Sequence, residues 1–314
     1  MDGRTFIKTV SGAMSVVALP LNLSANANDR ESTPVKKSFT TKFHYLDNPN
    51  LLTRGSTTVI RSTTYTYKSS FLLTLFAQAA TENNANDLRT DFGKKPMIIY
   101  ISNEETIQGA TNFLWRYFRN KNEYHHPDED LNFDADMHKR ADVIAELRKG
   151  GFVGAISCSQ HITSVDHLRD LISRYTDTGY EVIGVFVDNI NMFKEYNRFH
   201  SVAETSLLLL SRELNIMIAY TKTLGERALG LKRDGYIGHD LLREIAKQRS
   251  SQYNNQLAMD QVDLELTLTI DTTTTPKTLC VSKLTHDEPM SFITHPLLTE
   301  TTIIPYLTIG LDKG

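Results

Sequence analysis

The stretch STTVIRSTTYTYKSSFLLTLFAQAA, residues 56–80, decides the fold class. Its first six residues are mostly β-branched and predict a short buried strand over 56–61. Apolar residues at 71, 72, 75, 76 and 79 have helical spacing and predict a helix over 69–80. The polar loop between them ends in Lys68-Ser69. A strand, a loop ending in a Lys and a hydroxyl, and then a helix are typical of a phosphate-binding loop.

This loop keeps some features of a phosphate-binding loop and lacks others. In such loops backbone N–H groups surround the anion, the Lys reaches the terminal phosphates, and the neighbouring hydroxyl holds Mg²⁺. Glycine is favoured where the backbone approaches phosphate closely, but Ser62 and Tyr67 occupy the two glycine positions here. The alternative is a chance Lys-Ser pair at a helix start, because the chain has four other Lys-Ser or Lys-Thr dipeptides. The candidate nucleotide-binding residues are Ser62, Thr63, Thr64, Tyr65, Thr66, Tyr67, Lys68, Ser69 and Ser70.

Strands and helices alternate along the rest of the chain. The patterns predict strands over 96–102, 152–157, 180–188 and 215–220, and helices over 104–118, 134–151, 164–175 and 201–214. This alternation predicts an α/β fold with a mainly parallel sheet, right-handed crossovers and helices on both faces. After residue 260 the segments VDLELTLTI, KTLCVSKL, MSFIT and TIIPYLTIG are separated by turn-like stretches. They predict a C-terminal antiparallel extension of the same sheet.

Two acidic residues follow predicted strands. Glu104 comes after strand 96–102, and Asp188 ends the apolar strand 180–188. The carboxyl ends of parallel strands form the crevice in which ligands bind. An Asp after such a buried run is either a helix cap or a ligand of metal-bound water. With the loop, these residues predict Mg-nucleotide hydrolysis, in which Glu104 orients water and Ser69 and Asp188 form the metal side of the site.

The composition is that of a globular protein of ordinary content, with 314 residues, 40% hydrophobic and 23% charged. A net charge of −3 means that any nucleic-acid contact needs a local basic patch. Cys158 and Cys280 lie far apart, which excludes a disulfide framework and favours a reducing cytoplasm, or the host-cell cytoplasm if the protein is viral. The apolar run LLLL at 207–210 is too short to cross a bilayer, so we expect no membrane contact.

The first residues differ in character from the rest of the chain. Residues 1–42 are largely polar and predict an N-terminal arm or linker before a single domain over 43–314. The segment SGAMSVVALPLNLSANA loosely resembles a secretory signal. Its short apolar part and Pro20 favour the arm over a cleaved signal.

The order of these features resembles the RecA-type ATPase core of DnaB-like hexameric replicative helicases, including phage versions. FHYLDNPNLLTRGSTTVI (43–60) is similar to the family's lead-in, and YISNEE (100–105) to the strand before its catalytic glutamate. SCSQHITSVDHLRDLI (157–172) is similar to a segment that RecA-type recombinases lack. The resemblance continues through VFVDNINMF (185–193), LLSRELNIMIAYTKT (209–223), HDLLREIA (239–246) and MDQVDLELTLT (259–269). It is collinear over roughly residues 43–285.

The resemblance implies a RecA-like P-loop NTPase core that uses ATP and Mg²⁺, forms a homo-oligomeric ring or filament, and acts on single-stranded DNA in replication. Glu104 matches the catalytic glutamate, and Lys283 matches a residue that acts on the neighbouring subunit's nucleotide. Lys222 takes the sensor position at the tip of a strand. The stretch that contacts single-stranded DNA in the family supplies the DNA-binding candidates Arg243, Glu244 and Lys247.

The sequence also departs from the family pattern. Lys222 replaces a Gln, Thr285 replaces an Arg that reaches the neighbouring nucleotide, and the loop glycines are missing. Two interpretations follow. One is an ATP-driven helicase or translocase, which the retention of Lys68, Ser69, Glu104 and Asp188 favours. The other is a degenerate RecA-fold protein, recombinase-like or a non-catalytic DNA-binding or regulatory module, which the lost groups favour.

Overall fold

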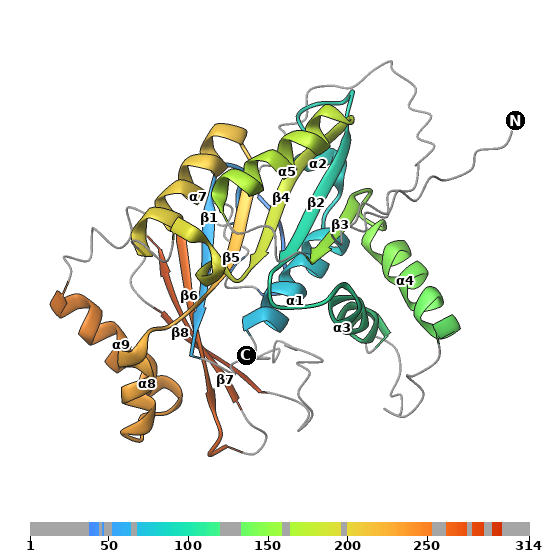
Figure 1. Ribbon diagram of the computed structural model, residues 1–314. Coiled ribbons are helices and arrows are strands. Elements are labelled where there is room, and N and C mark those ends of the chain that lie inside the picture. The colour runs from blue at the N-terminus through green and yellow to red at the C-terminus, as the bar shows by residue number, and fades with distance from the viewer. Residues whose placement is uncertain are drawn as a thin grey trace, which may run out of the picture.

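The computed structural model describes residues 38–43, 46, 52–63, 68–119, 133–158, 164–195, 200–252, 262–274, 278–285 and 291–296. They form one sheet in the order β3-β2-β4-β5-β1-β6-β7-β8 (Figure 1). The strands are β1 (Thr57–Ser62), β2 (Lys95–Ser102), β3 (Val153–Cys158), β4 (Tyr180–Asp188), β5 (Met217–Thr223), β6 (Leu264–Asp271), β7 (Thr278–Thr285) and β8 (Ser291–Pro296).

Strand direction confirms the predicted fold class and corrects one detail. The strands from β3 through β6 are parallel to their neighbours, while β7 and β8 pair antiparallel. The segment 262–270, predicted to begin the antiparallel extension, forms most of β6 and is parallel to β1. Its connection from β5 contains two helices and is long enough for a crossover, whereas only short connections follow it. The predicted strand 302–310 lies outside the described residues.

Helices cover both faces of the sheet, as predicted (Figure 1). One face carries α1 (Lys68–Thr81), α2 (Ala85–Leu88), α3 (Ile107–Arg119) and α4 (Phe133–Leu147). The opposite face carries α5 (Val165–Asp177) and α7 (His200–Leu214). The helices α8 (Glu226–Arg233) and α9 (Gly238–Gln252) lie beside β6 and β7, and the short 3-10 helix η3 (Ile190–Met192) follows β4. Within the described part of the chain, every helix is too short or too polar to span a bilayer.

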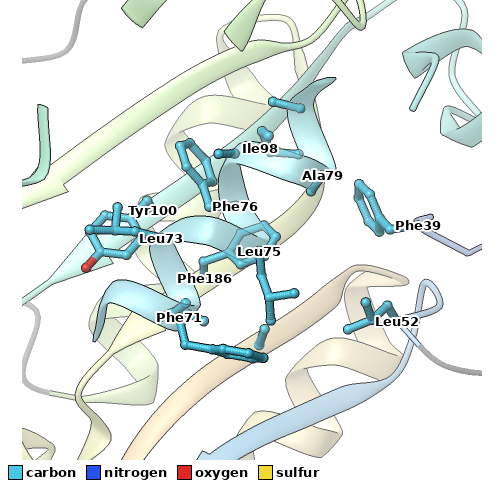
Figure 2. Packing of buried hydrophobic residues seen from close by; sticks show 14 of the residues in the cluster. Phe39, Leu52, Phe71, Leu73, Leu75, Phe76, Ala79, Ile98, Tyr100 and Phe186 are labelled. Carbon is cyan, nitrogen blue, oxygen red and sulfur yellow. The ribbon is translucent and has the colours of Figure 1, made fainter. Parts of the chain in front are cut away.

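Helix α1 is the centre of the larger core. Every residue from Phe71 through Ala80 is buried, because neighbouring helices and strands surround the helix. Figure 2 shows Phe76 of α1 facing side chains from β2 and β4. Its ring centroid lies 5.9 Å from that of Tyr100 and 5.4 Å from that of Phe186. This burial fixes the start of α1, and with it the predicted phosphate-binding loop, against the carboxyl ends of the strands.

Residues 38–43 also pack on this core. Phe39 is 2% exposed and occupies the space above Gly184 of β4, where a Cβ atom would lie 3.2 Å from the ring. The backbone N–H of Thr40 donates to Asn83 Oδ1 at 2.8 Å, and Asn83 Nδ2 donates back to the Thr40 carbonyl at 2.9 Å. Residues 38–42, which the sequence groups with the arm, thus contribute to the domain core. The segment that resembles a secretory signal lies outside the described residues.

Two helix starts illustrate how local chemistry sets boundaries. Ser164 is the N-cap of α5, as predicted, and its Oγ accepts a hydrogen bond from the His167 N–H at 3.1 Å. Helix α3 begins at Ile107 rather than at residue 104. The Thr106 hydroxyl accepts from the Gly109 N–H at 3.0 Å, which leaves Glu104 in the turn after β2 and outside the helix.

Candidate active site

Four of the predicted site residues lie together at the carboxyl ends of the parallel strands. Ser69, in the first turn of α1, donates its hydroxyl proton to Asp188 Oδ1 at 3.0 Å. Lys68 Nζ lies 3.7 Å from Glu104 Oε2. Strand register explains the meeting, because Ser102 at the end of β2 pairs with Asp188 at the end of β4. The structure therefore brings Lys68, Ser69, Glu104 and Asp188 into one cluster.

Asp188 is fully buried and surrounded by hydroxyl groups. Thr221 Oγ1 donates to its Oδ1 at 2.6 Å, while Tyr100 OH and Ser102 Oγ lie 3.4 Å from Oδ2. Burial raises the pKa of Asp188 above its ordinary value; the hydrogen bonds from Thr221 and Ser69 and the charge of Lys68 oppose that rise. Asn189 caps η3, so Asp188 does not serve as the cap that its position after the strand also allowed. The carboxylate is held at the site by hydroxyl donors.

Glu104 is more accessible, with 43% of its side chain exposed against 14% for Lys68. Asn189 Nδ2 donates to Glu104 Oε1 at 2.7 Å, so the carboxylate is held by an amide on one oxygen and faces Lys68 with the other. Ser102 Oγ accepts from the backbone N–H groups of Glu104 and Glu105 at 3.2 and 2.8 Å. These bonds turn the chain at the end of β2 and direct Glu104 toward the loop.

Three contributors were not among the predicted residues: Ser102, Asn189 and Thr221. Each lies at the end of a strand next to, or in register with, a predicted residue. A signal was present for Thr221, since it is a polar residue within the predicted strand region on the same side as Ala219 of the larger core. For Ser102 and Asn189 the useful signal was proximity to Glu104 and Asp188.

The start of the loop is anchored and its tip lies outside the described residues. Ser62 and Thr63 are buried, and the Leu224 N–H donates to the Ser62 carbonyl at 2.7 Å. This bond joins the end of β5 to the end of β1. Ser70 lies in the first turn of α1, where its carbonyl accepts from Thr74 Oγ1. The described residues do not include Thr64, Tyr65, Thr66 and Tyr67, so their contact with a nucleotide remains a prediction.

The donor set fits Mg²⁺. Ser69 and Asp188 supply hydroxyl and carboxylate oxygens 3.0 Å apart, and Mg²⁺ prefers oxygen ligands. Among the described residues, no group of three or more His, Cys, Asp or Glu side chains could form a metal cage by itself. Mg²⁺ commonly uses one or two protein ligands together with water and substrate phosphates. This site therefore suits an ion that arrives with a phosphate ligand.

The other predicted residues lie outside this cluster. Lys222 Nζ pairs with Glu204 Oε2 of α7 at 3.0 Å, so its side chain lies on the opposite face of the sheet from Asp188. Lys283 is in β7 and is 7% exposed in the single chain. Arg243 and Lys247 are exposed on α9 and pair with Asp240 and Glu244, respectively. Their predicted roles depend on a neighbouring subunit or on DNA, and they stay predictions.

Comparison with known proteins identifies the arrangement. The sequence model of the family described as "Divergent DnaB-like ATPase" matches residues 44–224, more than half of the chain. No curated protein matches the sequence. A solved structure of an isolated ATPase domain superposes with a TM-score of 0.54 at 13% identity, covering 81% of this chain and 84% of that one.

A second solved structure has the same fold. It is a DnaB-like replicative helicase described together with its interactions with primase. It matches with a TM-score of 0.57 at 16% identity and covers 89% of this chain. The match spans 64% of that helicase, so a part of the helicase lies outside the likeness. Both structures support a RecA-like ATPase fold.

Proposed function

The chain belongs to the family of divergent DnaB-like ATPases, and from this premise we propose that it is an ATP-hydrolysing motor that acts on single-stranded DNA. The observation that carries the proposal is the cluster of Lys68, Ser69, Glu104 and Asp188 at one edge of the sheet. A helicase or translocase in DNA replication is the activity that this family and this site support best. The protein would work as a homo-oligomer in the cytoplasm, or in the host-cell cytoplasm if it is viral.

Each residue of the cluster has a defined task in this proposal. Lys68 leaves Glu104 and binds the terminal phosphates of ATP. Ser69 and Asp188 hold the metal side of the site, where a bound Mg²⁺ would neutralise charge on the phosphates. Glu104, kept in place by Asn189, accepts a hydrogen bond from the attacking water and orients it. Lys283 supplies a positive charge to the nucleotide of a neighbouring subunit, and Lys222 occupies the sensor strand.

DNA contact is assigned to α9. Arg243 and Lys247 have side chains that are 58% and 74% exposed, so both can reach a phosphate backbone. Glu244, which pairs with Lys247, completes the predicted DNA-binding stretch. One of the similar helicases interacts with primase, and a comparable partner for this chain is part of the proposal.

A degenerate RecA-fold module is the second candidate. Ser62 and Tyr67 at the two glycine positions of the loop favour it, as does Thr285 in place of an arginine. Such a protein would bind DNA, mediate recombination or regulate assembly without turning over ATP. The two candidates differ in one measurable property, the hydrolysis of ATP.

The test combines ATP turnover, with and without single-stranded DNA, and thermal unfolding. Mg-ATP at a hundredfold excess over its Kd should stabilise the wild type by about 2.7 kcal/mol. Lys68→Ala should lose this stabilisation, whereas Lys94→Ala, which removes an exposed surface pair with Asp91, should keep it. Glu104→Gln should bind Mg-ATP and fail to hydrolyse it. If the wild type turns over no ATP under any condition, the motor proposal is wrong and the degenerate module remains.

A further inference from the structure

A cluster of four charged side chains lies on the face of the sheet opposite the candidate active site. Arg61 of β1 lies 3.2 Å from Glu204 of α7 through Nη2, and 3.2 Å from Glu265 of β6 through Nε. Lys222 Nζ of β5 lies 3.0 Å from the second oxygen of Glu204. All four side chains are at most 11% exposed. We call these four residues the charge cluster.

Glu204 is the residue on which the balance of the charge cluster depends. Arg61 and Lys222 are direct partners in the register of β1 and β5, so two positive charges lie side by side. Glu204 places one carboxylate oxygen on each of them, and Glu265 balances the remaining charge of Arg61. Burial and the charge of Arg61 lower the pKa of Lys222, while Glu204 opposes this. Without Glu204 the two cations would repel each other in a buried environment.

The backbone of the charge cluster continues directly into the site. Arg61 precedes Ser62 at the start of the loop. Lys222 follows Thr221, which donates the shortest of the hydrogen bonds to Asp188. Two residues after Lys222, the Leu224 N–H donates to the Ser62 carbonyl at 2.7 Å. The alternation of side chains along a strand thus puts Thr221 on the reacting side and Lys222 on the charged side.

We infer that the charge cluster is a positioning device for nucleotide hydrolysis, with Glu204 as its central positioning residue. It holds the ends of β1 and β5 together from behind, so that Ser62 and Thr221 keep their places beside Asp188. Stability alone is a poor reason for such a network, since buried ion pairs can often be replaced by apolar groups without loss. The inference rests on the proposed function, because it names a residue that supports the same site.

The test compares two Glu→Gln variants at buried ion pairs. Glu204→Gln breaks the charge cluster, and Glu181→Gln breaks the pair with Arg54 at 2.7 Å, which lies at the opposite ends of the strands. Both variants should unfold at lower temperature. We expect Glu204→Gln to lower kcat at least tenfold with Mg-ATP affinity within threefold of wild type. Glu181→Gln should keep kcat within twofold when both are assayed well below their melting temperatures.

A neutral double variant separates charge balance from a general packing defect. Glu204→Gln with Lys222→Gln leaves the pair of Arg61 and Glu265, so it should recover most of the lost kcat, while Lys222→Gln alone should not. If Glu204→Gln does not fold, the comparison of Lys222→Gln with the double variant carries the test. An unchanged kcat in Glu204→Gln, or in Lys222→Gln where that variant stands in for it, overturns the inference. Equal losses in Glu204→Gln and Glu181→Gln overturn it as well.

Amide hydrogen exchange of the unliganded protein keeps the inference separate from the proposed function. In Glu204→Gln the Leu224 N–H should exchange at least tenfold faster than in wild type, and in Glu181→Gln it should not. A wild type without ATP turnover refutes the motor, yet the exchange comparison still decides whether the charge cluster positions the strand ends. Equal exchange at Leu224 in the two variants would refute the positioning role whatever the turnover.

Discussion

Replacement of Asp188 by Asn should stabilise the unliganded protein and abolish Mg-dependent nucleotide binding. Asp188 is fully buried, and burial raises its pKa despite the hydrogen bonds from Thr221 and Ser69 and the charge of Lys68. The folded environment therefore disfavours the ionised carboxylate. An Asn has nearly the same shape and removes the charge, so the folded protein loses this unfavourable interaction.

The size of the effect follows from the contacts of Asp188. The Oδ1 of an Asn can still accept from Thr221 and Ser69, but each bond loses its charge assistance, at about 1 kcal/mol per bond. Its amide can donate to Tyr100 and Ser102, whose hydroxyl oxygens can also accept. Burying a carboxylate costs several kcal/mol. We expect a net gain of about 1 kcal/mol, or a rise in Tm of roughly 2–4 °C.

The pH dependence gives an independent check. Because the folded pKa of Asp188 is raised, the wild type bears the full penalty at pH values above that folded value. The penalty disappears as the pH falls through the folded value toward the unfolded value of 3.8. The stability advantage of Asp188→Asn should therefore shrink between about pH 7 and about pH 4.

Thermal unfolding of wild type, Asp188→Asn and the exposed control Asp91→Asn, with and without Mg-ATP, measures both effects. The wild type and Asp91→Asn should gain about 2.7 kcal/mol at a hundredfold excess of Mg-ATP over Kd, and Asp188→Asn should gain little. A variant that is several degrees less stable than wild type at neutral pH would contradict the argument from burial. A full Mg-ATP shift in Asp188→Asn would contradict the placement of the metal.

Three other substitutions test separate parts of the molecule. Lys283→Ala should lower steady-state ATP turnover at least tenfold, about 1.4 kcal/mol of barrier, without changing the Mg-ATP shift, and equal turnover at several protein concentrations would argue against a role between subunits. Arg243→Ala should reduce the slope of log binding constant against log salt for single-stranded DNA by about one unit or less, and an unchanged slope excludes that contact. Gly184→Ala should lower stability in urea by about 1–3 kcal/mol, because the added methyl group meets Phe39 at 3.2 Å, and the loss should be smaller in a Phe39→Ala background.

Much of the fold was predictable because local periodicity and burial agree. The predicted helix 69–80 is α1 within one residue at each end, and the apolar strand 180–188 is β4. The approach of Ser69, Glu104 and Asp188 was also predictable, since all three follow or precede strands of one parallel sheet. These predictions needed only the rule that ligands bind at the carboxyl ends of such strands.

Other features depend on contacts between distant segments, which periodicity does not contain. Periodicity identifies 262–270 as a strand but not its partner, and β6 is parallel because it lies beside β1. Lys222 lies one residue from Thr221, yet its side chain is on the opposite face and pairs with Glu204. Phe39 belongs to the core because Gly184, far along the chain, leaves room for its ring. Each outcome follows from tertiary contacts among residues that are far apart in sequence.

The pairing of Ser69 with Asp188 and of Lys68 with Glu104 has a consequence for the order in which ligands arrive. Each group that would receive the ion or the phosphates already has a partner in the unliganded chain. With one cation and two carboxylates, the cluster repels a free nucleotide more than it repels the less negative magnesium complex. We therefore expect the ion and the nucleotide to enter as one complex, with an association rate that falls steeply when magnesium is withdrawn. Stopped-flow mixing at fixed ATP and varied magnesium would reveal this order.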